Sequence, residues 1–242
     1  MKTTKILFPI LFVLVMVVMS SCNADIYGLY GRGNMASHTI LVSDFSSVEL
    51  LSSAQVQIVK GDAYEVVLTD YENLMDAHQL SVVDNKLLIS TRVGFPILNS
   101  KARVVITTPD PLNEVVLAGS GNILLLSEFN ELNRLSILGS GNIKAGSDNR
   151  LSELETVIAG SGNIEVHGKT DELKAGISGS GSLFLDNLEA QNAECRISGS
   201  GSISVHVVEQ LMAVITGSGN IIYSGSPEVD VHSSGSGHVS KE

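Results

Sequence analysis

Residues 119–123 read Gly-Ser-Gly-Asn-Ile, and close copies of this pentapeptide return six more times along the rest of the chain. The copies begin at Gly119, Gly139, Gly160, Gly179, Gly199, Gly217 and Gly235. Successive copies start 20, 21, 19, 20, 18 and 18 residues apart. A period near 20 residues is typical of solenoids, in which each repeat adds one turn to a stack. The repeat predicts the architecture well and the activity poorly.

The residues on both sides of each Gly-Ser-Gly alternate between apolar and polar. Counted from the first glycine, positions −4, −2, +4 and +6 are mainly apolar. Position −2 holds Leu117, Ile137, Ile158, Ile177, Ile197, Ile215 and Ser233, and position +4 holds Ile123, Ile143, Ile164, Leu183, Ile203, Ile221 and Val239. A period of two indicates a β-strand with one buried face. Each repeat is therefore expected to form a strand, a tight corner, a second strand and a polar return.

The glycines are expected to form the corners. Glycine adopts positive φ without a Cβ clash, and the asparagine that often follows tolerates the same region. A helix is disfavoured because each interior glycine costs about 1 kcal/mol. The expected turn ladder comprises Gly119, Gly121, Gly139, Gly141, Gly160, Gly162, Gly179, Gly181, Gly199, Gly201, Gly217 and Gly219. The serines between these glycines are expected to form a hydroxyl ladder along the rod.

Stacked coils of this kind predict an all-β fold, a parallel β-helix (β-solenoid) with coils of about 20 residues. Backbone groups would pair with the coils above and below, about 4.8 Å away. Because parallel crossovers are right-handed in about 98% of cases, we expect a right-handed β-helix.

One outward position tests this register. Position −5 holds Glu114, Arg134, Glu155, Lys174, Glu194, Met212 and Asp230, and the first five alternate in charge. In the proposed stack each charge lies over its opposite. Exposed ion pairs contribute only about 0–1 kcal/mol each, so the column is expected mainly to disfavour wrong stacking.

Residues 38–111 are β-rich but lie outside the period. Strand candidates cover 39–42, 47–50, 56–59, 64–68, 80–83, 87–90 and 102–106, and residues 71–78 could form one or two helical turns. A solenoid end exposes unpaired strand edges. Residues 38–111 are therefore expected to form broader N-terminal coils or a cap, continuous with repeat coils over 112–242 in one solenoid domain, 38–242.

The N-terminus resembles a bacterial lipoprotein signal. Lys2 and Lys5 precede an apolar run over residues 6–19, which is too short for a membrane span of about 20 residues. Met19-Ser20-Ser21-Cys22 then resembles a lipobox. The resemblance implies a signal peptide over 1–21 and acylation of Cys22, for example with palmitate, followed by a tether over 22–37. An ordinary secretory signal with a free cysteine remains the alternative.

Composition limits the partners. The formal net charge is −11, and the chain has no tryptophan. An acidic chain without a basic stripe argues against nucleic-acid binding and against electrostatic docking on anionic lipid.

Two cysteines do not make a disulfide framework. Cys195 falls in a small inward column with Ala175 and Ala213, as expected for a buried apolar residue.

The tandem repeats resemble the "putative auto-transporter adhesin, head GIN domain" family, which is common in Bacteroidetes. The opening segment is similar too, with Phe45-Ser46-Ser47-Val48, Val56-Gln57-Ile58, Leu87-Leu88-Ile89 and Val104-Val105-Ile106-Thr107-Thr108-Pro109. The resemblance covers about 40–240. It implies adhesion at the cell surface and brings no catalytic residues.

Known chemical motifs fit poorly. Phosphate-binding glycine loops need a following helix, whereas strands follow here. Acidic residues at position −8 (Glu131, Asp171 and Glu209) would lie about 10 Å apart, too far to share a cation. The corner serines lack an adjacent base, and His167 and His206 lie two coils apart. We expect no metal, no cofactor and no catalytic residue.

The sequence therefore favours a non-catalytic outer-membrane lipoprotein that presents an adhesive or structural surface to an envelope protein or a glycan. A glycan-binding or polysaccharide-cleaving β-helix is the first alternative, and an accessory that binds another envelope protein is the second. Outward Asp, Lys and Tyr would favour the glycan reading, whereas a flat apolar column such as Val116, Val157 and Val214 would favour protein contact.

Overall fold

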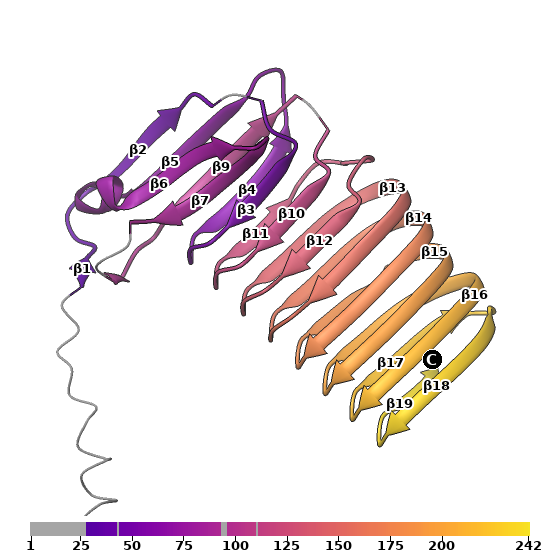
Figure 1. The fold of residues 1–242 in the computed structure, drawn as a ribbon. Coiled ribbons are helices and arrows are strands. Elements are labelled where there is room, and N and C mark those ends of the chain that lie inside the picture. The colour runs from indigo at the N-terminus through magenta and orange to yellow at the C-terminus, as the bar shows by residue number, and fades with distance from the viewer. Residues whose placement is uncertain (1–27, 43, 93–95, 110) are drawn as a thin grey trace, which may run out of the picture.

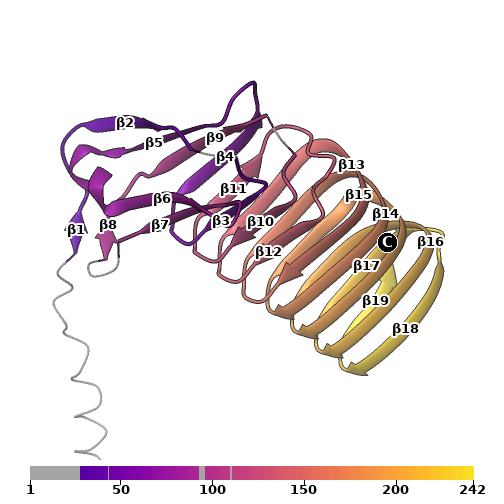
Figure 2. The same cartoon turned by 45° about the horizontal axis from the view of Figure 1, so that its top comes forward.

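The computed structural model describes residues 28–42, 44–92, 96–109 and 111–242. The chain forms a β-solenoid of about 6 turns with about 20 residues per turn. Figures 1 and 2 show the coils side by side, with the first strands at one end of the rod and the last strands at the other. The predicted parallel β-solenoid is confirmed.

Ten strands build the repeat coils, and all of them pair in parallel. The strands are β10 (Glu114–Leu117), β11 (Asn122–Leu125), β12 (Arg134–Ile137), β13 (Asn142–Ile158), β14 (Asn163–Gly179), β15 (Ser182–Gly199), β16 (Ser202–Gly217), β17 (Asn220–Gly225), β18 (Glu228–Gly235) and β19 (His238–Lys241). From β13 to β16 a single strand runs from one corner, around the return, to the next corner. The register pairs corner with corner, for example Gly179 with Gly199 and Gly199 with Gly217.

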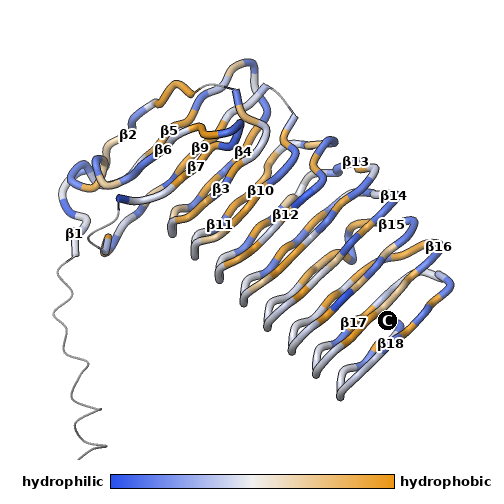
Figure 3. Tube along the Cα trace, in the orientation of Figure 1, coloured by the Kyte–Doolittle hydropathy of each residue, from blue (hydrophilic) through white to orange (hydrophobic). Residues whose placement is uncertain are grey.

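The inward columns form one continuous core. In the first six repeat coils, position −4 holds Val115, Leu135, Thr156, Ala175, Cys195 and Ala213, and all six are buried. Figure 3 shows apolar residues along the strands and pale, more polar residues at the corners. Cys195 lies between Ala175 and Ala213, as predicted, and burial raises the pKa of its thiol to about 12.

Both glycines of each corner are required mainly by close backbone packing. A Cβ on Gly141 would lie 1.7 Å from the carbonyl oxygen of Gly121, and one on Gly139 would lie 2.0 Å from that of Gly119. The first glycine has positive φ in the four later corners (Gly179, Gly199, Gly217 and Gly235), where left-handed backbone was predicted. Gly119, Gly139 and Gly160 are outside this region, so there the absent side chain is the reason for glycine.

The expected serine hydroxyl ladder is not present. Among the described corner residues, no hydrogen bond joins one serine hydroxyl to the next. Instead the serine N–H groups bond to glycine carbonyls one coil back, as from Ser200 to Gly179 at 2.9 Å. The side-chain ladder lies two residues further on. Asn122 Nδ2 donates to Gln55 Oε1, Asn142 Nδ2 to Asn122 Oδ1, and Asn163 Nδ2 to Asn142 Oδ1, at 2.8–2.9 Å.

The N-terminal region continues the stack in a different chain order. Its elements are β1 (Leu29–Tyr30), β2 (Met35–Ile40), β3 (Ser47–Leu50), β4 (Gln55–Lys60), β5 (Glu65–Tyr71), η1 (Glu72–Ala77), β6 (His78–Val83), β7 (Lys86–Thr91), β8 (Ile97–Leu98) and β9 (Arg103–Thr108). The coil of β3 and β4 lies between the coil of β7 and β9 and the coil of β10 and β11. β2, β5 and β6 pair in the antiparallel sense and, with η1, form what we term the N-terminal cap.

A further corner has no glycine. Ser52-Ser53-Ala54 joins β3 to β4, and its flanking residues Leu50 and Gln55 stand in register with Leu117 and Asn122. The neighbouring coil of β7 and β9 takes a wider path. The Leu51 and Gln55 N–H groups donate to the carbonyl groups of Ile89 and Ala102, which are much further apart in sequence than their two donors. Side chains are therefore tolerated on this corner.

The structure also describes the predicted helical turns over 71–78 and the C-terminal part of the predicted tether. The helical turns predicted over 71–78 are the 3-10 helix η1. The stretch expected as a tether instead contains β1 and the start of β2. β2 joins the sheet because it pairs with β5, and Ser37 Oγ lies 2.7 Å from Thr69 Oγ1.

Candidate interaction surface

The charged column at position −5 stacks in the predicted register. Arg134 lies between Glu114 and Glu155 and forms ion pairs with both, the first at 3.6 Å. Lys86 of β7 extends the column with a contact of 3.1 Å to Glu114. Lys174 turns aside and binds Glu153 at 2.6 Å rather than Glu155. The alternating charges thus form ion pairs along the first half of the column.

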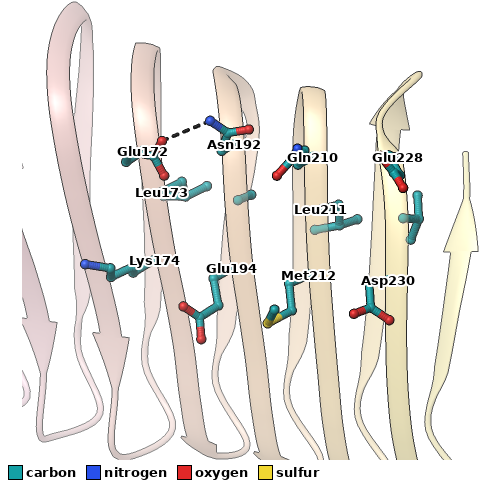
Figure 4. A pocket seen from close by; sticks show the side chains of 12 residues that line it. Glu172, Leu173, Lys174, Asn192, Glu194, Gln210, Leu211, Met212, Glu228 and Asp230 are labelled. Carbon is teal, nitrogen blue, oxygen red and sulfur yellow. Dashed lines mark hydrogen bonds between the residues drawn. The ribbon is translucent and has the colours of Figure 1, made fainter.

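A long groove runs across the coils beside the second half of this column (Figure 4). Its volume is about 350 Å³. One wall holds Glu172, Asn192, Gln210 and Glu228, the other holds Lys174, Glu194, Met212 and Asp230, and the floor holds Leu173, Ala193, Leu211 and Val229.

Periodicity explains the form of the groove. Each wall residue lies in register with its equivalent in the next coil, so like positions repeat at the strand spacing of about 4.8 Å. Leu173, Ala193 and Leu211 form one inward column beneath the groove, and each is at most 5% exposed. Asn192 Nδ2 donates to Glu172 Oε1 at 2.9 Å. The groove therefore offers an extended partner two polar rows whose members repeat from coil to coil.

A second outward cluster lies on the other face of the rod. Glu165 accepts hydrogen bonds from Lys144 at 2.7 Å and from His167 at 2.8 Å. These two hydrogen bonds, of which the one from the Lys144 ammonium has the larger effect, hold the pKa of Glu165 below its usual range. His206 instead contacts Ser224 at 2.8 Å. The two histidines thus have separate partners.

The catalytic arrangements considered from the sequence are not assembled in the described part of the chain. No group of three or more His, Cys, Asp and Glu side chains with metal-binding geometry occurs there. Glu131, Asp171 and Glu209 are exposed.

The apolar column at Val116, Val157 and Val214 is interrupted, because Ser136 lies between the first two and Gly176 and Arg196 lie between the last two.

A buried carboxylate organises the N-terminal cap. Asp70 is fully buried, and its oxygens accept hydrogen bonds from Ser100 Oγ at 2.6 Å and from the Tyr71 and Lys101 N–H groups at 2.8 Å. His78 Nε2 lies 2.8 Å from the same carboxylate. Burial alone would raise the pKa of Asp70, but these hydrogen bonds outweigh it and the pKa lies below its ordinary value. A nucleophilic serine needs an adjacent base, but the Ser100 hydroxyl contacts the Asp70 carboxylate rather than the His78 ring. The cluster is therefore structural.

This cluster was not predicted from the sequence, although β5 carries a signal for it. Val66, Leu68 and Asp70 share one phase of the β5 alternation, and the first two are core residues. A carboxylate in an inward phase requires buried donors.

An open cavity of about 690 Å³ lies at the cap end of the rod. We term it the cap cavity. Apolar side chains that line it include Ile40, Leu68, Met75 and Leu80, and polar ones include His38, His78 and Gln79. An apolar lining with a few polar groups is typical of small-molecule sites.

The predicted lipidation site, Cys22, lies outside the described residues. Within them, no helix has the length and apolar character that a membrane crossing needs.

These features define a class: a capped, two-faced parallel β-solenoid whose outward surfaces are polar grooves and charge ladders. The family profile for the "putative auto-transporter adhesin, head GIN domain" matches residues 44–227, and the chain belongs to this family. The resemblance noted in the sequence is thereby confirmed. The adhesin-like family indicates a cell-envelope or surface protein and favours a non-enzymatic role.

Solved structures show the same fold. A putative adhesin from Bacteroides fragilis is 22% identical with a TM-score of 0.80, over 89% of this chain and 100% of that one. A putative lipid binding protein from Parabacteroides distasonis is 28% identical with a TM-score of 0.75, over 88% and 99%. A putative adhesin from Parabacteroides merdae is 21% identical with a TM-score of 0.69, over 89% and 99%. Among curated proteins, none matches the chain.

Proposed function

We propose that the protein is a non-catalytic outer-membrane lipoprotein, anchored through Cys22, that presents its solenoid as an adhesive or structural surface. The long groove carries this proposal. It presents two polar rows whose members repeat from coil to coil, as suits an extended partner with a regular backbone. The adhesin names of the family and of the relatives support the same role.

The groove can be tested with a matched pair of variants. Full-length protein in detergent would be incubated with a panel of host and dietary polysaccharides and with envelope extracts, and both retention and polymer shortening would be recorded. Glu172→Lys with Gln210→Lys should abolish retention of the bound partner. Asp186→Lys with Ser204→Lys, outside the groove lining, should leave it intact.

The panel also separates the alternatives. A retained polysaccharide would favour the glycan-binding reading, although the groove lining contains no aromatic platform. Shortening of any polymer would contradict the non-catalytic proposal. Equal retention of the partner by both double variants would contradict the proposal that the partner binds in the groove.

The anchor needs its own experiment. Cells supplied with a clickable palmitate analogue should label the wild-type protein and a Cys195→Ala variant, and they should fail to label Cys22→Ala. Alanine suits position 195 because Ala175 and Ala213 flank it in the column. Label retained on Cys22→Ala would overturn lipidation at this residue.

A second candidate function is the binding of an apolar ligand in the cap cavity. The observation that favours it is the apolar lining described above, and the name of the Parabacteroides distasonis relative is consistent with it. A fluorescent long-chain fatty acid should bind the wild-type protein and Leu41→Trp, whose position is 86% exposed. Ile40→Trp should block the cavity and remove binding. Binding unaffected by Ile40→Trp would exclude this cavity.

A further inference from the structure

The two ends of the rod differ. At one end the N-terminal cap reverses the strand direction. At the other end, within the described residues, β18 pairs with β16 alone and β19 with β17 alone. One edge of each strand therefore presents unpaired backbone donors and acceptors, which readily pair with a further strand.

The side chains at this end leave the core uncovered. Val231 lies in the inward column below Ala213, yet it is 47% exposed. Val239, in the column of Ile221, is partly exposed as well. In the equivalent columns one coil earlier, Ala213 and Ile221 are fully buried.

We propose that a second copy of this chain covers the end, so that two rods join tail to tail about a two-fold axis through Val231 and Val239. Both residues lie four positions from Gly235, on opposite sides of the corner. A single axis across the rod can therefore pass through both. It would place β18 antiparallel to the partner's β18 and β19 antiparallel to the partner's β19, extending both faces of the stack.

Among axes at Val229, Asp230 and Val231, the outward residues of β18 favour the axis at Val231. With the axis at Val231, Asp230 stands opposite the partner's His232, Glu228 stands opposite a serine, and the two copies of Val231 face each other. An axis at Asp230 would oppose two Asp230 carboxylates, and an axis at Val229 would oppose Glu228 to Asp230. Like charges directly opposed are unfavourable, whereas a carboxylate and an imidazole can pair. Asp230 and His232 already lie 3.5 Å apart within one chain, and both side chains are well exposed.

Cysteine cross-linking tests the axis directly. Residues directly opposed in antiparallel strands have Cα atoms about 4.5–5.5 Å apart, which suits a disulfide. Full-length protein with Val231→Cys should form a disulfide-linked dimer on mild oxidation. The matched variant Val229→Cys should not, because its own copy lies roughly 13 Å away along the strand. Val229→Cys combined with Ser233→Cys in one chain should again give the dimer. The wild-type protein controls for Cys22.

Sedimentation of the full chain in detergent supplies a second readout. Asp230→Lys should weaken the dimer at least tenfold, since the lysine would face the partner's His232 in place of a carboxylate. The exchange Asp230→His with His232→Asp should restore it. Equal cross-linking by the two single-cysteine variants, a ladder of species larger than a dimer, or a monomer at all concentrations would each overturn the two-fold arrangement.

Discussion

Asn142 Nδ2 donates a 2.8 Å hydrogen bond to Asn122 Oδ1, one coil earlier in the stack. The Asn142 main-chain N–H also bonds to that oxygen, at 3.1 Å. The amide of Asn142 in turn accepts a bond from Asn163. One side chain thus joins three successive coils just beyond the corner.

Replacing Asn142 should loosen this corner. Asn142→Ala should lower the free energy of unfolding by about 1–2 kcal/mol, because hydrogen bonds to both neighbours are lost. Asn187→Ala is the control, since Asn187 is exposed and, among the described residues, its side chain bonds to the adjacent Asp186 alone. Urea unfolding would compare the two. Equal effects would argue against the asparagine ladder as a stabilising element.

The corner glycines should differ in tolerance from glycines elsewhere. Gly141→Ala should destabilise the protein by roughly 2–4 kcal/mol, because the new Cβ would collide with the Gly121 carbonyl and the coils would have to separate. Gly146→Ala should change stability by less than about 1 kcal/mol, since its Cβ would meet only the end of the Lys144 side chain, at 3.5 Å. Thermal unfolding would separate them, and similar melting temperatures would contradict the packing argument.

The charged column should matter through its sign pattern. Arg134→Ala should cost at most about 1 kcal/mol, as is usual for exposed pairs. Arg134→Glu should cost more, because it would stack a third carboxylate between Glu114 and Glu155. Added salt should reduce the difference between the two variants, since it screens exposed charges. A charge reversal that is no worse than alanine at low salt would show that the column does not affect stacking.

Acid should weaken the N-terminal cap through Asp70. The folded-state pKa of this carboxyl is lowered, so its contribution is present above the unfolded pKa of about 3.9 and is lost as pH falls through the folded value. Asp70→Asn should cost about 2–4 kcal/mol near neutral pH, because it disrupts a buried hydrogen-bonded cluster. The gap to the wild type should shrink below about pH 4. Unfolding curves at several pH values would show this, with exposed Asp186→Asn as control. A constant gap would contradict the role of the charge.

The sequence predicted the repeat coils because their information is local. Apolar residues four and two positions before Gly119, and four and six after it, were enough to define the inward columns. The same spacing surrounds Ser52, with Val48, Leu50, Val56 and Ile58, and the structure places a corner there. The Gly-Ser-Gly pattern does not mark this corner, because a wider neighbouring coil makes glycine unnecessary there.

Other features depend on contacts distant in sequence. The insertion of the β3–β4 coil between its neighbours is set by tertiary pairing that no local pattern records. Asp70 accepts a hydrogen bond from Ser100, which lies in a loop 30 residues later in the chain. Lys174 forms an ion pair with Glu153 instead of the expected Glu155, because a long side chain reaches sideways as easily as along a column.

The parallel pairing of coils also has a mechanical consequence. The hydrogen bonds between coils run along the rod, so a pull on its two ends loads the bonds between one coil and the next. Each coil contributes a rise of only about 4.8 Å but holds about 20 residues, which extend to roughly 65–70 Å when released. Under tension the rod would lengthen in discrete steps of roughly 60 Å, one coil at a time, and each step would dissipate work while the remaining coils stay folded.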